Sequence, residues 1–302
     1  MKKVSVILTT YNSAGTIENT LQTILNQSGI HSIFELEVVV VDDCSTDQTW
    51  DILGKSAVSR FRTERNSGGP NTGRNIGLNV ASGDYICIAD HDDSWENQRL
   101  ASLLPYLEKA PIVTSGYTLV DEVKNKNIVR KNSSDSSHLF FSKNETFLKK
   151  LTKSLSGQNT YLGSIIFKKE LKHILFEEHF GMVDFDWILR MLHQQESIEV
   201  CDSLYTRYVT DQNLSLNEAY RVKDFYYSLM HIESYENLYP REVSLAYRKI
   251  HGSRARYYYL MGNMKKARFY FMRSRWDLVT LLYYLTTFAG SGFVKKRFNV
   301  FG

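Results

Sequence analysis

The sequence is poor in cysteine and proline. Its 302 residues include three cysteines (Cys44, Cys87 and Cys201), none of which forms a C-x-x-C pair. An odd number of widely spaced cysteines predicts neither a disulfide framework nor a cysteine zinc site, and it is typical of a reducing compartment. The chain has four prolines and no low-complexity tract, which argues against long disordered segments.

Two common nucleotide-binding motifs are also missing. The chain has no G-x-x-x-x-G-K-[ST] sequence, and no G-x-G-x-x-G sequence follows a predicted strand. Because these loops hold the phosphates in P-loop kinases and in nicotinamide-dependent dehydrogenases, the sequence argues against both classes.

No long apolar run follows the basic residues at the N-terminus. Lys2 and Lys3 precede a short apolar run at residues 4–8, whereas the apolar core of a signal peptide has roughly 7–15 residues. We therefore expect a cytosolic protein and interpret residues 4–8 as a buried strand.

Positive charge is concentrated toward the C-terminus. Residues 241–302 contain thirteen Lys or Arg and two acidic residues, a net charge of +11, whereas the whole chain has a net charge of +4. This asymmetry predicts an anionic partner for residues 241–302.

Strand and helix patterns alternate through the first 110 residues. Buried strands are predicted at residues 4–8, 36–41, 61–64 and 84–89, and helices at 17–25, from 50, from 76 to 81 and over 95–109. This alternation predicts an α/β domain with a largely parallel sheet and flanking helices.

The pattern changes after residue 112. We expect strands at 112–120, 164–167 and 205–208, a polar loop at 121–138, and helices at 143–155 and from 184. From residue 218 the chain has helical patterns, with a hairpin turn at Gly262-Asn263. We therefore expect two domains, an α/β domain at 1–217 and a basic, aromatic-rich helical region at 218–302.

Polar residues follow three of the predicted strands. They are Thr9 to Asn12, Asp42-Asp43 and Asp90-His91-Asp92-Asp93, and a glycine-rich loop at 66–77 adds Arg74. Because the carboxyl ends of parallel strands meet at one sheet edge, we expect a cleft lined by acids, the ring of Tyr11 and Arg74. This composition suits a nucleotide diphosphate held without a P-loop.

The D-x-D-D spacing of residues 90–93 has two interpretations. Carboxylates this close repel one another unless a cation lies among them, and a hard divalent metal held by carboxylates and substrate phosphates is one solution. A solvated acidic turn is the other.

These motifs, in this order, resemble those of family 2 glycosyltransferases of the GT-A fold, a Rossmann-like α/β architecture. The matching segments are residues 4–12, 40–47, 73–77 and 90–93, and the resemblance covers roughly residues 1–215. It implies an inverting transfer from a nucleotide sugar, most often a UDP-sugar, with Mg²⁺ or Mn²⁺.

The resemblance also implies roles for the strand-end residues. Tyr11 would stack near the uracil, Asp43 or Asp42 would pair with the ring N–H, and Arg74 would lie near the nucleotide. Asp92 would bind the metal, with Asp90 and Asp93 next to ribose, sugar or metal-bound water. Thr9 and Asn12 complete the nucleotide-sugar site.

The general base of the family corresponds to Asp184, in Val183-Asp184-Phe185-Asp186. Val183 departs from the family pattern, which has an acid there. Asp186 is the reserve candidate, although a first-turn helix acid is the structural alternative. Gln158, Asn159 and Gln212 resemble segments near the acceptor and diphosphate, or are ordinary loop residues. The implied reaction is a single displacement that inverts the anomeric carbon.

The basic region suggests where such an enzyme works. We expect its helices to lie on the anionic inner face of the cell membrane, with a lipid-linked acceptor for lipopolysaccharide or capsule synthesis. A helical packing domain or a dimer surface is the alternative, and no nucleic-acid-binding motif occurs. For the whole chain, a sugar nucleotidyltransferase and a catalytically silent glycan- or nucleotide-binding scaffold are the competing functions.

Overall fold

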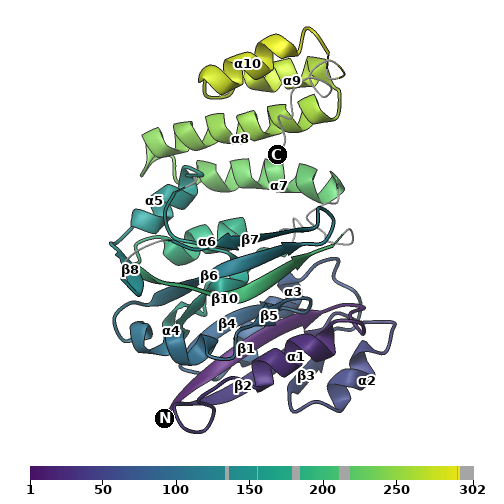
Figure 1. Cartoon of the computed structure of the whole chain (residues 1–302), viewed down its shortest axis with the longest axis vertical. Coiled ribbons are helices and arrows are strands. Elements are labelled where there is room, and N and C mark those ends of the chain that lie inside the picture. Colours follow the sequence, from purple (N-terminus) through teal and green to yellow (C-terminus); the bar gives the residue numbers. More distant parts are fainter. Residues whose placement is uncertain (133–135, 155, 179–183, 211–217, 291, 293–302) are drawn as a thin grey trace. The chain divides into compact units, whose positions relative to one another are not determined.

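The computed structural model of the chain describes residues 1–132, 136–154, 156–178, 184–210, 218–290 and 292. It contains two compact units (Figure 1). Unit 1 comprises residues 1–147 and 156–223, and unit 2 comprises residues 148–155 and 224–302.

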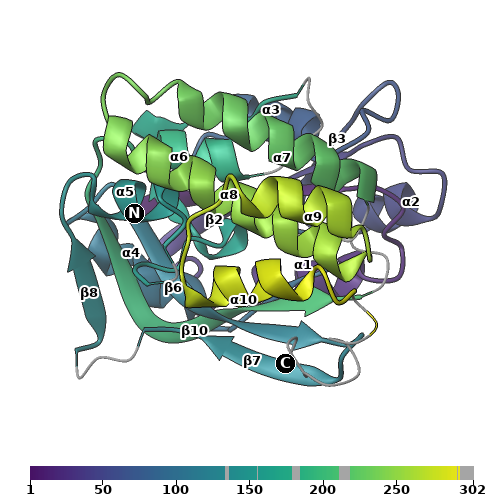
Figure 2. The ribbon, with the colours of Figure 1, turned by 90° about the horizontal axis from the view of Figure 1, so that it is seen from above.

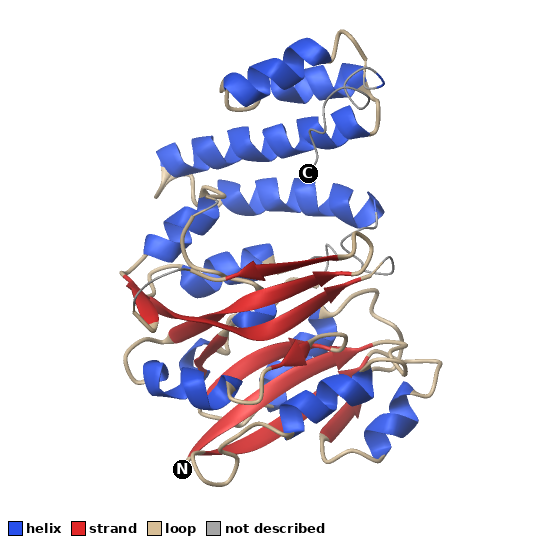
Figure 3. Cartoon of the chain, viewed as in Figure 1, coloured by secondary structure: helices blue, strands red, loops and turns tan. Residues whose placement is uncertain are grey.

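Unit 1 is built on a ten-stranded sheet, drawn in red in Figure 3. Its strands are β1 (Lys2–Thr10), β2 (Phe34–Asp42), β3 (Ser59–Arg62), β4 (Tyr85–Asp90), β5 (Ser94–Trp95), β6 (Ile112–Asp121), β7 (Lys126–Arg130), β8 (His138–Phe141), β9 (Ile166–Lys168) and β10 (Ser197–Val209). The main order is β3-β2-β1-β4-β9-β6-β10-β5, with β7 paired to β6 and β8 to β10.

The first four strands of this order are parallel. β10 is parallel to β6, whereas the three-residue β9 runs antiparallel to both β4 and β6. The predicted α/β class is confirmed, and the sheet is parallel on the side formed by the first ninety residues.

Helices cover this sheet and enclose the core of unit 1. They are α1 (Ile17–Leu25), α2 (Thr49–Gly54), α3 (Asn71–Val80), α4 (Arg99–Leu107) and α6 (Phe185–Leu192), with 3₁₀ turns η1 (Leu162–Ser164) and η2 (Lys169–Leu171). α3 lies very close to β1, because a Cβ atom at Gly77 would be 2.3 Å from Cγ2 of Ile7. Only glycine allows this approach.

Three details differ from the expectations. The polar segment 121–138 contains β7, whose mostly exposed residues pair with β6 at the sheet surface. α4 begins at Arg99 rather than at 95, because Ser94 and Trp95 pair with β10. β10 begins at Ser197, eight residues earlier than predicted, and its first five residues are buried.

Unit 2 is helical. α5 (Glu145–Leu151) and α7 (Glu218–Glu233) each run across the boundary between the units, and α8 (Pro240–Leu260), α9 (Met264–Phe271) and α10 (Leu278–Thr286) follow. α8 packs on α9, and α9 on α10, as Figure 2 shows from above. The predicted hairpin is confirmed, since Gly262 has φ 78° and the Asn263 side chain accepts a 3.1 Å hydrogen bond from Lys266 N.

The core of unit 2 includes a buried cluster of Ala255, Tyr259, Ala267 and Phe271. Val243, Ala246 and Ile250 of α8 are buried as well. Among the helices in the described ranges, none has the length and apolar character that a membrane-spanning segment requires.

Candidate functional site

The ends of β1, β2 and β4 lie at one edge of the sheet. In register, Thr9 is next to Val41 on one side and Asp90 on the other, and Thr10 is next to Asp42. The structure therefore brings together the three polar strand ends singled out in the sequence.

The loop after β1 is fixed by Asn12. Its backbone has φ 47°, its N–H donates to Ser45 Oγ at 2.9 Å, and its Oδ1 accepts from Thr46 N at 2.8 Å. Asn12 thus ties the β1 loop to the β2 loop. The adjacent Tyr11 is 43% exposed, so its ring is open to a stacking partner.

The two acids after β2 have different surroundings. Asp42 is fully buried, forms a 3.2 Å ion pair with Arg62 Nε and accepts from Ser45. Asp43 accepts from Ser67 N and Ser67 Oγ, both at 2.9 Å, and from Thr63 Oγ1 at 3.0 Å. Asp42 therefore anchors its own loop, whereas Asp43 connects β2 to the glycine-rich loop.

Arg74 links the glycine-rich helix α3 to the acidic turn. Its Nη2 donates to Asp90 Oδ1 at 3.0 Å, its Nη1 donates to Asn71 Oδ1 at 3.1 Å, and the residue is 6% exposed. The next residue, Asn75, exchanges two hydrogen bonds with the backbone of Phe176, at 2.7 and 2.9 Å. Arg74 is therefore held in one orientation beside Asp90.

Asp93 is the most enclosed carboxylate of the acidic turn. Only 2% of it is exposed, and it accepts hydrogen bonds from Tyr205 Oη (2.6 Å), Tyr161 Oη (3.2 Å) and Tyr208 N (3.0 Å). Burial raises the pKa of Asp93 well above its usual range, and the charges of the neighbouring Asp90 and Asp92 raise it further.

Asp92 differs from its two neighbours. Burial raises its pKa, and the net shift stays upward although nearby His91 and Arg207 favour the charged form. Within the described part of the chain, no other residue donates a hydrogen bond to this carboxylate. A cation bound at Asp92 would offset the free-energy cost of burying this charged carboxylate and its repulsion from Asp90.

The metal implied by the family resemblance fits this arrangement. No group of three or more His, Cys, Asp or Glu side chains in the described ranges could hold a metal by itself. Mg²⁺, however, is commonly held by one or two carboxylates together with substrate phosphates. Asp92 is the carboxylate available for this role, because Asp90 and Asp93 are engaged by protein donors.

The sequence reasoning missed Tyr161 and Arg207. The Tyr161 hydroxyl donates to both Asp90 and Asp93, at 3.2 Å each, and burial followed by these two charges raises its pKa well above 10. The Arg207 guanidinium lies 4.9 Å from the centroid of the Tyr161 ring.

The charges of the acidic turn and of Asp184 both act on Arg207. Burial alone would lower the pKa of Arg207, but the nearby Tyr161, Asp93, Asp90 and Asp184 raise it overall. Asp184 is half-buried at the N-cap of α6. The sequence contained one signal for these residues. Tyr205 and Arg207 are two positions apart on a strand, and therefore on the same face, shortly before a polar loop.

Tyr205 depends on a glycine. A Cβ atom at Gly163 would lie 2.2 Å from the Tyr205 hydroxyl and ring, so a larger residue would displace the ring. The Gly163 carbonyl accepts a 2.7 Å hydrogen bond from Arg99, whose guanidinium stacks 4.0 Å from the centroid of Trp95. The tyrosine behind Asp93 is thus packed against a fixed backbone.

The residues expected near the acceptor have other partners. Gln158 binds Thr114 Oγ1 at 3.0 Å and Ile198 O at 3.1 Å, and Asn159 N donates to buried Glu199 at 2.8 Å. Both residues therefore connect their loop to strands β6 and β10.

The remaining two candidates are also placed. Asp186 is 3% exposed and forms a 2.8 Å ion pair with Arg190 one helical turn later. This contact agrees with the structural alternative for a first-turn acid. Gln212 lies outside the described residues.

Comparison with known proteins adds sequence relatives. The family model described as "Glycosyl transferase family 2" matches residues 5–175. A UDP-Glc:alpha-D-GlcNAc-diphosphoundecaprenol beta-1,3-glucosyltransferase, WfaP of Escherichia coli, is 33% identical over 38% of this chain and 45% of its own length. TuaG of Bacillus subtilis, a putative teichuronic acid biosynthesis glycosyltransferase, is 36% identical over 39% of this chain and 47% of its own. The chain spans less than half the length of these relatives.

Solved structures show the same fold. The 1–349 fragment of Staphylococcus aureus TarS in complex with UDP superposes with a TM-score of 0.67 at 19% identity, covering 99% of this chain and 93% of that one. A mannosyltransferase from Pyrobaculum calidifontis, in complex with GDP-Man and Mn²⁺, has a TM-score of 0.59 at 20% identity and coverages of 95% and 80%. The predicted GT-A fold is confirmed.

Proposed function

Because this chain belongs to glycosyl transferase family 2, we propose that it transfers a sugar from a UDP-sugar to a hydroxyl group of a glycan or lipid-linked acceptor. The product would be a cell-surface polysaccharide, as the relatives' names suggest. The observation that carries the proposal is the meeting of the ends of β1, β2 and β4 at one sheet edge, where Asp90 accepts a 3.0 Å hydrogen bond from Arg74.

The donor is proposed to bind along the edge formed by β1, β2 and β4. Tyr11 stacks on the uracil, and Asp43, at the glycine-rich loop, pairs with the ring N–H. Thr9, Asn12 and Asp42 support these contacts by fixing the loops. A further complex of TarS, with UDP-GlcNAc, supports UDP as the carrier.

The diphosphate is proposed to lie over the acidic turn. Mn²⁺ or Mg²⁺ bound at Asp92 would supply positive charge to the diphosphate oxygens. Arg74 and Arg207 add guanidinium donors, which match phosphate geometry. Asp90 and Asp93, held by the tyrosines, keep Asp92 oriented and lie close to the ribose or the sugar.

Asp184 is proposed as the general base. It takes the proton of the acceptor hydroxyl, and the freed oxygen forms a bond to the anomeric carbon from the face opposite UDP. The bond from that carbon to the diphosphate oxygen breaks at the same time, and its electron pair stays on the leaving UDP. One displacement at one carbon inverts its configuration.

Residues 241–302 are proposed to attach the protein to the inner face of the cell membrane. Their net charge of +11 supports attraction to an anionic leaflet. A lipid-linked acceptor would be presented at that surface.

The test measures UDP release from a panel of UDP-sugars, with and without Mn²⁺, for wild type and Asp184→Asn. Loss of a general base should lower turnover by about 10²–10⁴-fold while UDP binding, measured by calorimetry, is unchanged. Asp186→Asn is the matched control, because this acid pairs with Arg190 and should affect stability rather than turnover.

Three outcomes would contradict the proposal. Turnover by Asp184→Asn at the wild-type rate would contradict the assignment of Asp184 as the general base. Release of pyrophosphate in place of UDP would indicate a sugar nucleotidyltransferase. Binding of UDP-sugar without any release, with every acceptor, would indicate a silent scaffold.

A further inference from the structure

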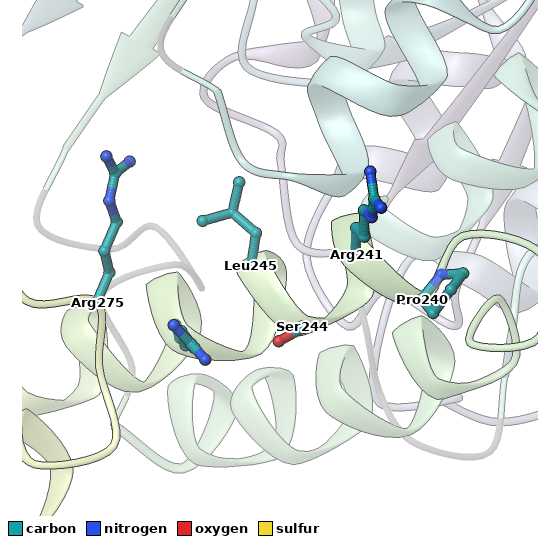
Figure 4. A pocket seen from close by; sticks show the side chains of 6 residues that line it. Pro240, Arg241, Ser244, Leu245 and Arg275 are labelled. Atoms are coloured by element: carbon teal, nitrogen blue, oxygen red, sulfur yellow. The ribbon is translucent and has the colours of Figure 1, made fainter.

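A cationic groove lies on unit 2, apart from the residues assigned to catalysis. It has a volume of about 420 Å³ and is lined by Pro240, Arg241, Ser244, Leu245, Arg248 and Arg275. This volume is within the range of roughly 300–1,000 Å³ that is usual for small-ligand sites. Figure 4 shows Arg241 and Arg275 extending to the same side of α8, with Leu245 between them.

The groove is a product of helical spacing. Arg241, Ser244, Leu245 and Arg248 are three, four and seven residues apart, so they share one face of α8. Arg275 comes from the segment between α9 and α10 and completes the lining. Three arginines from two parts of the chain therefore line one groove.

The described residues offset little of the positive charge of this groove. In the ranges that the structure describes, neither Arg241 nor Arg248 forms an ion pair with a carboxylate. Asp277 lies near Arg275, but its Oδ1 already accepts a 2.7 Å hydrogen bond from Thr280 N. Glu242 follows Arg241 but does not line the groove. A bound anion would relieve the mutual repulsion of the three arginines.

The position of Arg241 strengthens this inference. It lies in the first turn of the 21-residue α8, where the helix dipole disfavours a cation. The N-cap residue, Tyr239, provides no side-chain capping hydrogen bond. Ser244 adds a hydroxyl donor to the guanidinium groups. This set of donors suits a phosphate group.

An exposed apolar row begins three residues after Arg275. On α10 and just beyond it, the outward residues are Leu278, Leu281, Leu282, Leu285 and Phe288, which are 41–72% exposed. The buried residues on the same segment are Thr280 and Thr287. The helix thus turns its threonines inward and its leucines outward.

Such a row marks an interaction surface. At nine residues α10 is far too short to cross a bilayer, but a short apolar face beside cationic residues suits a helix that lies in the membrane interface. Trp276, 49% exposed, stands between Arg275 and the row, and tryptophan is enriched at that interface.

We propose that unit 2 holds a specific site for the phosphate of an anionic lipid headgroup, formed by Arg241, Arg248 and Arg275, with α10 receiving the acyl chains beside it. The inference rests on the membrane attachment proposed above and narrows it to defined residues. It is independent of the proposed reaction.

The first experiment measures flotation of the full chain with vesicles of phosphatidylcholine, alone or mixed with phosphatidylglycerol. Wild type should bind the anionic vesicles, and Arg241→Gln/Arg248→Gln/Arg275→Gln should bind them at least about tenfold more weakly. The matched control, Lys265→Gln/Arg256→Gln/Arg273→Gln, removes three exposed cations of the same unit outside the groove. It should keep most of the binding.

The two triple variants distinguish a specific headgroup site from membrane attachment by net charge alone. Equal losses in both would show attraction by net charge, which overturns the headgroup site and leaves membrane attachment standing. No flotation of wild type would overturn both. Binding of inorganic phosphate that is lost in the groove variant, together with equal vesicle binding by wild type and that variant, would identify a site for the free anion and overturn the lipid assignment. UDP release, measured in parallel, reports separately on the proposed reaction.

The second experiment tests the apolar row with Leu281→Gln/Leu285→Gln. Binding should fall about tenfold or more, whereas Leu238→Gln, which removes a 64% exposed leucine elsewhere in unit 2, should change little. Circular dichroism verifies folding. If wild type self-associates in sedimentation and the double variant becomes monomeric while vesicle binding is unchanged, the row joins two copies of the chain, and the lipid role is overturned.

Discussion

The Tyr205 hydroxyl donates a 2.6 Å hydrogen bond to Asp93, a carboxylate that is 2% exposed. Tyr205 lies 112 residues further along the chain, on β10, so this contact joins the far side of the sheet to the acidic turn. It fixes one of the three carboxylates of the acidic turn.

Replacing Tyr205 with Phe should therefore destabilise the fold by about 1–3 kcal/mol, because a buried carboxylate loses a short hydrogen bond. Urea unfolding measures this change. Tyr208→Phe is the control: Tyr208 contacts Asp93 through its backbone N–H, and its hydroxyl has only a 3.4 Å contact with Ser94. A stability loss in the control as large as that in Tyr205→Phe would contradict the assignment.

Gly163→Ala should reproduce the Tyr205→Phe defect, because the added Cβ would occupy the place of the tyrosine hydroxyl. If both act through the bond to Asp93, the double variant should be less destabilised than the sum of the singles, by about 0.5–3 kcal/mol. Gly15→Ala, with open space around the new Cβ, is the neutral control. Full additivity of the two changes would argue that they act separately.

Glu37 gives a test of acid stability. Burial alone would raise its pKa, but hydrogen bonds from Lys3, Ser5 and Ser82 lower it from 4.5 to about 2. Because the folded-state pKa is depressed, the contribution of Glu37 is full above pH 4.5 and is lost as the pH falls toward 2. One pKa unit corresponds to about 1.4 kcal/mol, so the contribution is bounded at roughly 3 kcal/mol. With 17% of the side chain exposed, solvent screening reduces it somewhat.

Glu37→Gln should accordingly lower the free energy of unfolding most at pH 7 and progressively less between pH 4.5 and 2. Unfolding curves at several pH values measure the difference from wild type. Glu35→Gln is the control on the same strand, since Glu35 forms an exposed ion pair with His31. A difference for Glu37→Gln that stayed constant down to pH 2 would rule out the charge as the cause.

The thiols of Cys44 and Cys87 should react at very different rates. Cys44 is half-exposed, whereas Cys87 is buried and its pKa is raised to about 11 by that burial. At neutral pH, N-ethylmaleimide should modify Cys44 first, and Cys44→Ser should remove the fast phase. If UDP binds beside Asp43, it should slow this phase. Equal rates with and without saturating UDP would place the nucleotide elsewhere.

The fold was predictable because its strands are continuous apolar runs. β1, β2 and β4 are largely buried on both faces, so their sequences are mainly runs of apolar residues. Their order along one edge follows from parallel pairing, which is why the acids after β2 and those after β4, 47 to 51 residues apart, could be placed together. β9 has three residues and runs antiparallel, and no pattern of that length specifies direction.

The candidate site was less predictable where it depends on distant partners. Tyr161 reaches Asp90 and Asp93 across about seventy residues, and a tyrosine in a polar loop carries no mark of such a contact. Gln158 and Asn159 have the composition of a binding loop, and in the structure they form hydrogen bonds to strands β6 and β10. The sequence did not identify Glu199 as a buried partner of Asn159, because Glu199 lies in a stretch of β10 where polar and apolar residues alternate.

The short antiparallel β9 joins the two halves of the sheet. In the described sheet β9 lies between β4 and β6, and it pairs over three residues with β4 and over two with β6. The edge that carries Tyr11, Asp43 and Arg74 is thus separated from the edge that carries Arg207 by a narrow seam. Few backbone hydrogen bonds therefore join the two halves of the sheet, so a substitution that shifts one half should transmit little strain to the other through the strands.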